Sequence, residues 1–408
     1  MQQRKSPIEA ENMSFWKVLI LLSGLAFLMP LIIDIFLPAI PAMAASFDVS
    51  TGEIQITLAS LNLGAAIGQI VYGPLADRFG RRPVIIVAMS VFSLAGFATV
   101  IAPNVEWLNF LRFIQGLTAA SGMIIVRAVV RDLYDGAVAA KMLAYTFVTG
   151  SIMPIAAPII GGNVTVWFGW QPNFYIIGGI GVLVLASLWI WLEETGERDF
   201  QAINVQVMSK SFFRLARDRD FVTYAFTGIG PYAGLFAILT TLSSILIEFM
   251  GLSPTVFGYL FGLIMLGNLA ASLLAGRIVT SVGEMPLIYA GCTICLISGI
   301  TAGCLAWVSV LTPAEIVIPS LGFMIGFALL VPAATAGAMS PFPDMAGRAS
   351  SLIGLVHYTA GAITSLLIGL TADGTYIPLV SALTICGILS FLSIWPLSKL
   401  NNRNTQLN

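Results

Sequence analysis

Two oppositely charged side chains lie inside long apolar stretches, where charge is rare. Asp34 is seventeen residues after Lys17, and Arg112 is six residues after Glu106. At ~1.5 Å per helical residue, Asp34 lies ~25 Å along its helix from Lys17, and Arg112 lies ~9 Å along its helix from Glu106. Because the two helices run in opposite directions across the membrane, Asp34 and Arg112 lie at similar depths. Ionisable residues inside a bilayer are costly and indicate function. The pair predicts a proton switch in which Asp34 is charged against Arg112 in one state and protonated in another.

Two plainer interpretations stay open. The pair can be a static ion pair, or Asp34 can reach water at the outer leaflet past Pro38. A purely structural pair in hydrocarbon offers little stability, because desolvating two charges offsets most of their attraction. We therefore favour the switch.

Other positions on the same two helices are candidates for a substrate cavity. They share the helical face of Asp34 or follow Arg112 at helical spacing. The candidates are Phe27, Leu31, Gln115, Ala119 and Met123. Soft apolar walls with few polar groups suit lipophilic or amphiphilic solutes, although packing in a core produces the same pattern.

The elements that position these residues are membrane spans. The chain is 58% hydrophobic and 10% charged, with a mean hydropathy of +0.93, which is typical of a lipid-embedded protein. A span of ~30 Å of hydrocarbon takes ~20 apolar residues. Twelve stretches are long enough: Phe15 to Ala42, Ile54 to Leu75, Val84 to Ile101, Glu106 to Val126, Val138 to Gly161, Pro172 to Leu192, Phe221 to Ile247, Thr255 to Ile278, Leu287 to Val308, Ala314 to Ala338, Ala349 to Leu370 and Ile377 to Leu397.

The basic residues orient these spans. Of the nineteen Lys and Arg residues, all except Arg112 fall on one side of the membrane. The positive-inside rule places that side, and both termini, in the cytoplasm. A net charge of −1 argues against nucleic acid as a partner.

The longest hydrophilic segment divides the spans into two sets of six. We expect an N-terminal bundle over residues 1–192, a cytoplasmic linker over 193–220 and a C-terminal bundle over 221–408. The loops GPLADRFGRRP at Gly73 to Pro83 and GRIVTSVGEMP at Gly276 to Pro286 occupy equivalent places in the two halves. The predicted fold is an all-α integral membrane protein of twelve transmembrane helices in two pseudo-symmetric six-helix bundles.

The linker has two interpretations. Its second part, Ser209 to Asp220, mixes phenylalanine and leucine with four basic residues. This composition suits a short amphipathic helix on the inner leaflet, near anionic headgroups. A solvated charged linker is equally compatible with it.

One loop and one span carry residues that suit moving parts. In the loop between the second and third spans, glycines permit close approach and tight turning, Asp77 can pair with an arginine or with a helix N-terminus, and the arginines anchor the inner face. The loop is either a topological anchor or, as we favour, a latch that breaks as the halves rock; its residues are Gly73, Asp77, Arg78, Gly80, Arg81 and Arg82. In the fifth span two prolines each remove an amide donor, so the helix should bend, and nearby glycines allow tight packing. These residues are Gly150, Pro154, Pro158, Gly161 and Gly162.

Other reactive side chains are weaker candidates. His357, the only histidine, lies within the eleventh span, where a packing role is commoner than a proton relay. Glu248 and Glu315 fall at outward span ends, where water solvates them. Cys292 and Cys295 form a C-x-x-C in an apolar helix without a histidine nearby, so we expect packing rather than metal or redox chemistry.

Four stretches resemble motifs of the major facilitator superfamily, and more closely its twelve-span drug:proton antiporters of the Bcr/CflA type. They are GPLADRFGRRP, IDIFLPAIPAM at the end of the first span, LRFIQGLTAASG from Leu111 to Gly122, and GSIMPIAAPIIGG from Gly150 to Gly162, in which Ala157 replaces the usual glycine. The resemblance covers essentially the whole chain. It implies proton-coupled multidrug efflux, antibiotic resistance and a place in a bacterial inner membrane.

Competing functions are a membrane-embedded enzyme, a sensor, or a carrier of a defined metabolite. The sequence has one histidine, no H-E-x-x-H, no nucleotide loop and no soluble domain, which argues against the first two. A carrier of a siderophore, sugar or amino acid derivative, in either direction, stays open. We expect the proton as coupling ion and no other cofactor, with small-molecule substrate and membrane lipid as partners of a monomer.

Overall fold

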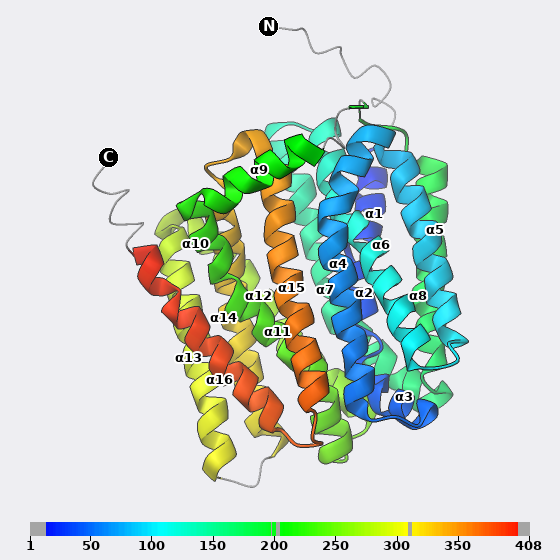
Figure 1. Cartoon of the computed structure of the whole chain (residues 1–408), viewed down its shortest axis with the longest axis vertical. Coiled ribbons are helices and arrows are strands. Elements are labelled where there is room, and N and C mark those ends of the chain that lie inside the picture. The colour runs from blue at the N-terminus through cyan, green and yellow to red at the C-terminus, as the bar shows by residue number, and fades with distance from the viewer. Residues whose placement is uncertain (1–13, 197, 201–204, 309–311, 399–408) are drawn as a thin grey trace, which may run out of the picture.

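The computed structural model describes residues 14–196, 198–200, 205–308 and 312–398 (Figure 1). Within these residues twelve helical segments are long and apolar enough to cross a membrane, as the sequence predicts. We call the end at which the first helix begins at Phe15 the proximal end and the opposite end the distal end. The spans run alternately between the two.

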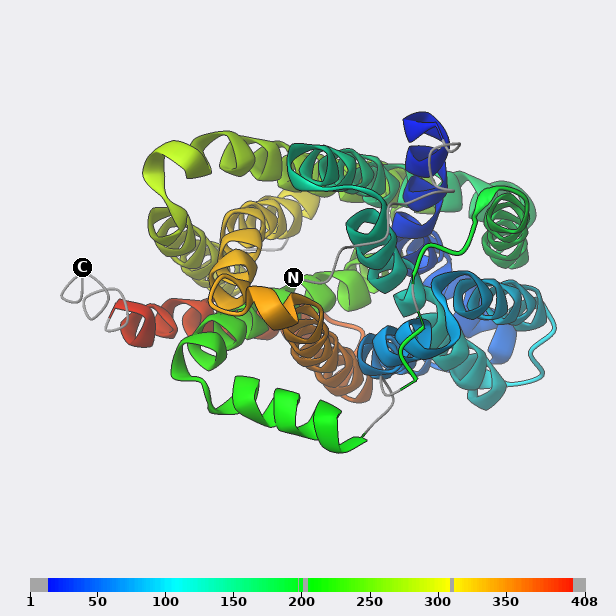
Figure 2. The ribbon, with the colours of Figure 1, turned by 90° about the horizontal axis from the view of Figure 1, so that it is seen from above.

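The first six spans comprise α1 (Phe15–Ala26), α2 (Leu28–Asp34), η2 (Leu37–Ala39), α3 (Ile40–Phe47), α4 (Thr51–Phe79), α5 (Arg81–Val100), α6 (Val105–Leu133), α7 (Gly136–Phe168) and α8 (Gln171–Trp191). After α9 (Val205–Arg217), the remaining six comprise α10 (Arg219–Thr227), α11 (Ile229–Ser243), η3 (Ser244–Phe249), α12 (Pro254–Val282), α13 (Glu284–Val308), α14 (Pro313–Met339), η4 (Pro343–Met345), α15 (Ala346–Thr371) and α16 (Ile377–Leu392). Figure 2, seen from above, shows the two sets as two groups of helices.

The first and seventh spans are broken helices, which the apolar pattern does not reveal. A proline cannot donate to the carbonyl four residues earlier, so a helix tends to end there. Pro30 stands four residues after Ala26, the last residue of α1, and Pro38 stands four residues after Asp34, the last residue of α2. In the seventh span Pro231 bears the same relation to the end of α10 at Thr227. Asp34 therefore lies at a helix break rather than within a regular helix.

The repeat seen in the sequence is also present in the backbone. The turn between α4 and α5 is made by Gly80 at φ 102°, and the turn between α12 and α13 by Gly283 at φ 81°. A residue with a Cβ is strained at such φ values, so both halves use glycine to reverse direction within one residue. The equivalent turns support the pseudo-symmetry of the two halves.

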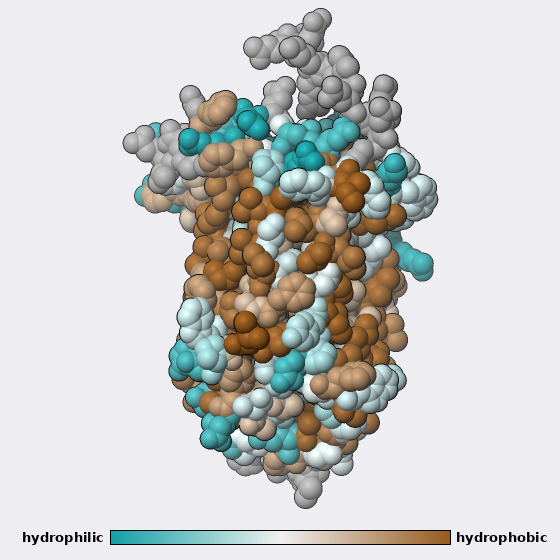
Figure 3. All heavy atoms as spheres, turned by 90° about the vertical axis from the view of Figure 1, so that its right-hand side faces the viewer, coloured by the Kyte–Doolittle hydropathy of each residue, from teal (hydrophilic) through white to brown (hydrophobic). Residues whose placement is uncertain are grey.

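The outer surface of the bundle is apolar between its ends. In Figure 3 brown side chains dominate the middle of the visible face, and teal ones gather toward the ends. Leucines with wide exposure, such as Leu94 at 68% and Leu183 at 69%, point outward from the middle of α5 and α8. Exposure of this kind suits contact with lipid.

The linker contains a helix, α9, that lies across the proximal end (Figure 1). The helix begins before the predicted start at Ser209 and ends before the predicted end at Asp220. Leu215 is fully buried against the second half, and the Arg348 guanidinium donates to the Ser211 hydroxyl at 2.7 Å. Exposed Phe213, 4.0 Å from the Arg217 guanidinium carbon, is on the outer side. The amphipathic helix is thus present, and its contact with the leaflet stays a prediction.

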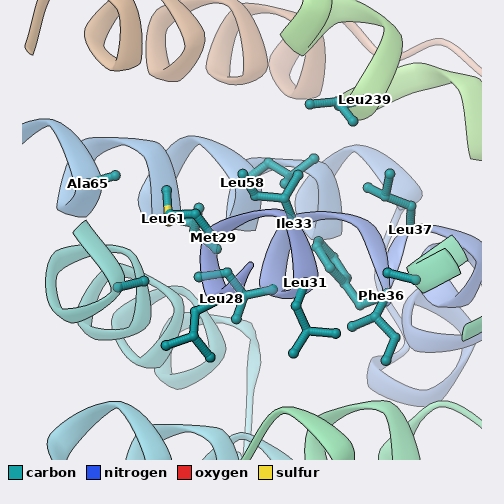
Figure 4. Close-up of a cluster of buried hydrophobic side chains, with 14 of the residues drawn as sticks. Leu28, Met29, Leu31, Ile33, Phe36, Leu37, Leu58, Leu61, Ala65 and Leu239 are labelled. Atoms are coloured by element: carbon teal, nitrogen blue, oxygen red, sulfur yellow. The ribbon is translucent and has the colours of Figure 1, made fainter. Parts of the chain in front are cut away.

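The two halves are pressed together at the distal end. The amide of Gln55 on α4 donates to the Ser244 hydroxyl at 2.7 Å, and the Thr255 hydroxyl donates to Asn163 of α7 at 3.3 Å. In Figure 4, Leu239 of α11 faces Leu58 of α4 and Ile33 of α2. Polar and apolar contacts therefore close this end.

The contacts between α7 and α12 that involve glycine lie in the distal parts of these helices, from Gly162 against Pro254 to Gly262 against Ile155. Toward the proximal end, over residues 136–152 and 272–282, more than half of the side chains are exposed, and each helix keeps one buried face, which includes Met142, Thr146 and Ala275. Beside them, α4 and α15 stay in contact from Gly52 near the distal end to Gly354 near the proximal end.

Candidate functional site

Asp34 ends the short helix α2 and is 4% exposed. The break at Pro38 leaves the Asp34 carbonyl without its helical donor and places the side chain at a discontinuity in the first span. Among the described residues, no hydrogen bond or ion pair joins the Asp34 carboxyl group to another side chain. Low dielectric disfavours an isolated carboxylate, so this arrangement suits the protonated acid.

Arg112 is completely buried on α6 and is held by other groups. Its Nη2 donates to the Ile32 carbonyl oxygen at 2.8 Å, and its Nη1 donates to the Gln115 Oε1 at 2.9 Å. The guanidinium carbon lies 4.1 Å from the Phe36 ring centroid and 5.8 Å from that of Phe174. A cation over an aromatic face is stabilised without a counter-ion.

The structure thus brings the predicted pair to one depth but does not join it. Arg112 binds the backbone of α2 two residues before Asp34, which confirms that the two spans are neighbours at this level. The ion pair itself is absent among the described residues. Two buried donors near the guanidinium have no partner there, the Nε of Arg112 and the Nε2 of Gln115.

The predicted cavity residues divide into two groups. Leu31 and Ala119 are 1% exposed and belong to the apolar core, and Gln115 is fully buried against Arg112. Only Phe27, at the break between α1 and α2, and Met123 keep partial exposure. Their role as substrate contacts stays a prediction.

The proximal loop between α4 and α5 is an ionic cluster on the first half. Arg81, 5% exposed, binds the Asp77 Oδ1 at 2.9 Å and the Asp132 Oδ2 at 3.0 Å, and donates to the Ala76 carbonyl at 3.0 Å. Arg78 lies over the Phe79 ring. Gly73 has open space where a Cβ would stand. Every one of these contacts is made within the first half, so in the described part of the chain these residues of the predicted latch hold the first half together rather than bridge the two halves.

Two acidic residues of this cluster were not singled out from the sequence. Asp132 follows Arg131 in the last turn of α6, and Glu194 follows α8. The Glu194 carboxylate accepts from the backbone amides of Arg81 at 2.8 Å and Arg82 at 3.2 Å, at the N-terminus of α5, where a negative charge is favourable. Their positions at the ends of spans are the only sequence signal for them.

The predicted kink residues lie where α7 packs most tightly. The helix continues through Pro154 and Pro158. A Cβ on Gly161 would overlap the Ile35 carbonyl oxygen, and one on Gly162 would lie 2.3 Å from the Pro254 carbonyl oxygen of α12. Gly150 makes ordinary contact with Ala26. Gly162 therefore allows the close approach of the two halves at the distal end.

The weaker candidates have structural surroundings. His357 is 4% exposed and stacked on Tyr232 at 4.1 Å between ring centroids, with no hydrogen-bond partner for its Nε2 in the described part of the chain. Glu315 accepts from the Thr312 amide at 2.6 Å at the start of α14, and Glu248 is exposed. Cys292 and Cys295 are buried, free thiols.

Comparison with known proteins agrees with this architecture. The family described as the Major Facilitator Superfamily matches residues 22–366. The chain belongs to the Major Facilitator Superfamily. The chain is 30% identical to the Bicyclomycin resistance protein homolog of Haemophilus influenzae over 388 residues, which cover 92% of this chain and 95% of that protein. Against Multidrug resistance protein D of Escherichia coli it is 29% identical over 367 residues, covering 89% and 91%.

Solved structures of this superfamily share the fold. The D-xylose-proton symporter has a TM-score of 0.77 at 15% identity and covers 93% of this chain and 97% of its own. The inward open conformation of the xylose transporter XylE from E. coli has a TM-score of 0.75 at 15% identity, with 94% and 96% covered. The twelve-span, two-bundle fold predicted from the sequence is confirmed, and the protein is a membrane transporter of this superfamily.

Proposed function

We propose that this protein exports small lipophilic compounds in exchange for protons, by alternating access, in the inner membrane of a bacterium. The names of its relatives, which include bicyclomycin and multidrug resistance, support drugs as the substrate class. Its own residues support the coupling. In this proposal the proton is the coupling ion, no other cofactor is needed, and one chain is the functional unit.

The observation that carries the proposal is the isolation of Asp34. A buried carboxyl group without a cationic partner is stable when protonated and costly when charged, by several kcal/mol in a site of low dielectric. Such a group can take up a proton in one conformation and release it only when the surroundings change. A proton carrier needs this dependence on conformation.

Arg112 and Gln115 supply the change of surroundings. Each has one buried donor without a partner among the described residues, and an unsatisfied buried donor costs about 1–3 kcal/mol. When Asp34 loses its proton, a carboxylate drawn toward these donors satisfies them and gains the guanidinium as counter-ion. Substrate entry that displaces α2 toward α6 would favour this second arrangement, which links binding to proton release.

The charge distribution and the contacts between the halves support the direction. All described Lys and Arg residues except Arg112 and Arg127 lie in the proximal loops or near the proximal ends of their helices, which by the positive-inside rule supports a cytoplasmic proximal end. In this proposal the conformation described here, with the halves in contact at the distal end, is closed outside and takes up a compound from the cytoplasm for export. The boundaries at 192 and 220 separate the two moving bundles, and α9 lies along the inner leaflet.

Reconstitution into proteoliposomes tests the proposal. With an imposed pH gradient, ethidium should accumulate against its own gradient on the acidic side, and a protonophore should abolish this accumulation. Asp34→Asn should transport at the rate of empty liposomes, whereas Glu106→Gln, which removes an exposed carboxylate on α6, should transport like the unmodified protein. Ethidium movement that ignores the pH gradient would overturn proton coupling.

A further inference from the structure

The stripe of predicted cavity residues on α6 does not end at Met123. Gln115, Ala119 and Met123 follow one another at intervals of four residues, and the next position in the series is Arg127. Twelve residues of helix span ~18 Å, so Arg127 lies on the same face as Gln115 but much nearer the proximal end. It is the second arginine of this helix face.

The side chain of Arg127 lies at the boundary between the halves, where it is exposed to solvent. Its Nη1 donates to the Ser350 hydroxyl of α15, across the boundary between the halves. Tyr358 follows Ser350 on α15, and Tyr232 of α11 stacks on the adjacent His357 at 4.1 Å between ring centroids, so both tyrosines line the same part of the boundary between the halves.

Arg127 has spare capacity for an anion. A guanidinium has five N–H donors, and of these one donates to a described residue. No described carboxylate forms an ion pair with it. Arg112, in contrast, is completely buried and already held by a carbonyl, an amide and two aromatic rings. Of the two arginines on this face, only Arg127 can meet a solute that enters from the proximal end.

The surroundings of Arg127 suit an aromatic body attached to the anion. Tyr232 packs edge-on against Phe327 at 5.1 Å between centroids, and Tyr358 lies 6.3 Å from Phe236. Both tyrosines are half-buried and carry hydroxyl groups that can donate to a second anionic oxygen. Planar bidentate donors beside aromatic walls are a favourable arrangement for carboxylates and sulfonates with an attached ring.

We propose that Arg127, together with Tyr232 and Tyr358, forms a subsite at the mouth, the proximal end of the boundary between the two halves, and that this subsite captures the anionic group of an aromatic amphiphile. The subsite deepens the proposed export function, on which its place in transport rests. An anionic solute binds here first, before its apolar body moves along the α6 stripe toward Asp34. Neutral solutes pass the same mouth without using Arg127.

Equilibrium binding to the purified protein in lipid nanodiscs tests this subsite, with the signal of empty nanodiscs subtracted. The probes are 1-anilinonaphthalene-8-sulfonate and N-phenyl-1-naphthylamine, which share an aromatic body and differ by the sulfonate. Arg127→Met should weaken binding of the sulfonate by about tenfold or more, the scale of a lost charge-assisted hydrogen bond, and change binding of the amine by less than about twofold.

Two matched variants separate anion capture from a structural bridge. Arg131→Met removes a cation one turn further along α6, where the side chain is 64% exposed, and should leave both probes unchanged. Ser350→Ala removes the hydroxyl to which Arg127 donates and should leave sulfonate binding intact. Equal weakening of both probes in Arg127→Met, or a loss of sulfonate binding in Ser350→Ala, would overturn the proposal.

A measurement on the unmodified protein covers the case in which Arg127→Met does not fold. Phenylglyoxal should modify Arg127, read by mass spectrometry of its peptide, and saturating sulfonate probe should protect it whereas the neutral amine should not. Protection by both probes, or by neither, would refute the subsite. These binding and labelling measurements need no proton gradient, so they are independent of the transport assay. If they give the contradicting result while ethidium is exported, only the subsite is refuted. If they give the expected result while ethidium is not exported, only the export function is refuted.

Discussion

Gly162 controls how closely the two halves approach at the distal end. A Cβ on this residue would lie 2.3 Å from the Pro254 carbonyl oxygen, 2.9 Å from its carbon and 3.2 Å from the Thr255 Cα. All three are backbone atoms, so no side-chain rotation relieves the overlap. Gly162→Ala therefore forces α7 away from α12 and should destabilise the distally closed conformation.

The expected magnitude follows from the cost of overpacking. One inserted methyl group in a well-packed contact costs about 1–3 kcal/mol, which shifts a two-state equilibrium by about 5- to 150-fold. The gain in helix propensity from glycine to alanine, about 0.5–1 kcal/mol, is present in both conformations and cancels between them. The open distal state should therefore become well populated without substrate.

Distances between spin labels measure this shift in nanodiscs. Labels at Ile101 and Ile377, both exposed at the distal end, should move apart, and labels at Val138 and Val282, exposed at the proximal end, should approach. The matched control is Gly179→Ala on α8, where a Cβ meets no atom within 4 Å. The background protein carries serine in place of Cys292, Cys295, Cys304 and Cys386. Unchanged distances in Gly162→Ala, or equal changes in the control, would refute the reasoning.

Three further predictions concern charged residues. Asp77→Asn, which loosens Arg81 within the first half, should lower turnover but leave equilibrium substrate binding nearly intact; normal turnover with a large loss of affinity contradicts this. Arg112→Met removes the cation that Asp34 needs when charged, so the pH at which substrate binding releases protons, measured by titration, should rise. The double variant that combines Arg112→Met with Asp34→Asn should transport no worse than Asp34→Asn alone. An unmoved titration with selective loss of anionic substrates counts against the switch. Glu194→Gln removes a charge from the N-terminus of α5 and should lower the free energy of unfolding by about 0.3–1 kcal/mol, whereas an unshifted thermal midpoint contradicts that role.

The number of spans could be predicted because it depends on the length of apolar runs, which the sequence displays directly, but their limits were less accurate, as in the fifth span, which ends at Phe168 rather than at Gly161. The breaks in the first and seventh spans could also have been inferred, since Pro38 and Pro231 each stand four residues after a helix end. They were not, because prolines are common in transmembrane helices and many are absorbed without a break, as Pro154 and Pro158 are in α7.

The site was harder to predict than the fold. Depth along a helix follows from residue counting, so the similar level of Asp34 and Arg112 was accessible. The choice of partner was not, because a guanidinium can be held by a carboxylate, a carbonyl, an amide or an aromatic face, and only the tertiary packing brought Ile32 and Phe36 to it. The same limit applies to Arg127, which the charge pattern counts only among the basic residues of the cytoplasmic side and which in the folded chain donates to Ser350 of the other half.

In the proposed function Asp34 carries the coupled proton, and this role can be measured as proton release on substrate binding. Purified protein in weakly buffered detergent solution should release protons when ethidium is added, as read by a pH indicator, and Glu106→Gln should release as many. Asp34→Asn should bind ethidium and release none. Undiminished proton release from Asp34→Asn would contradict the account.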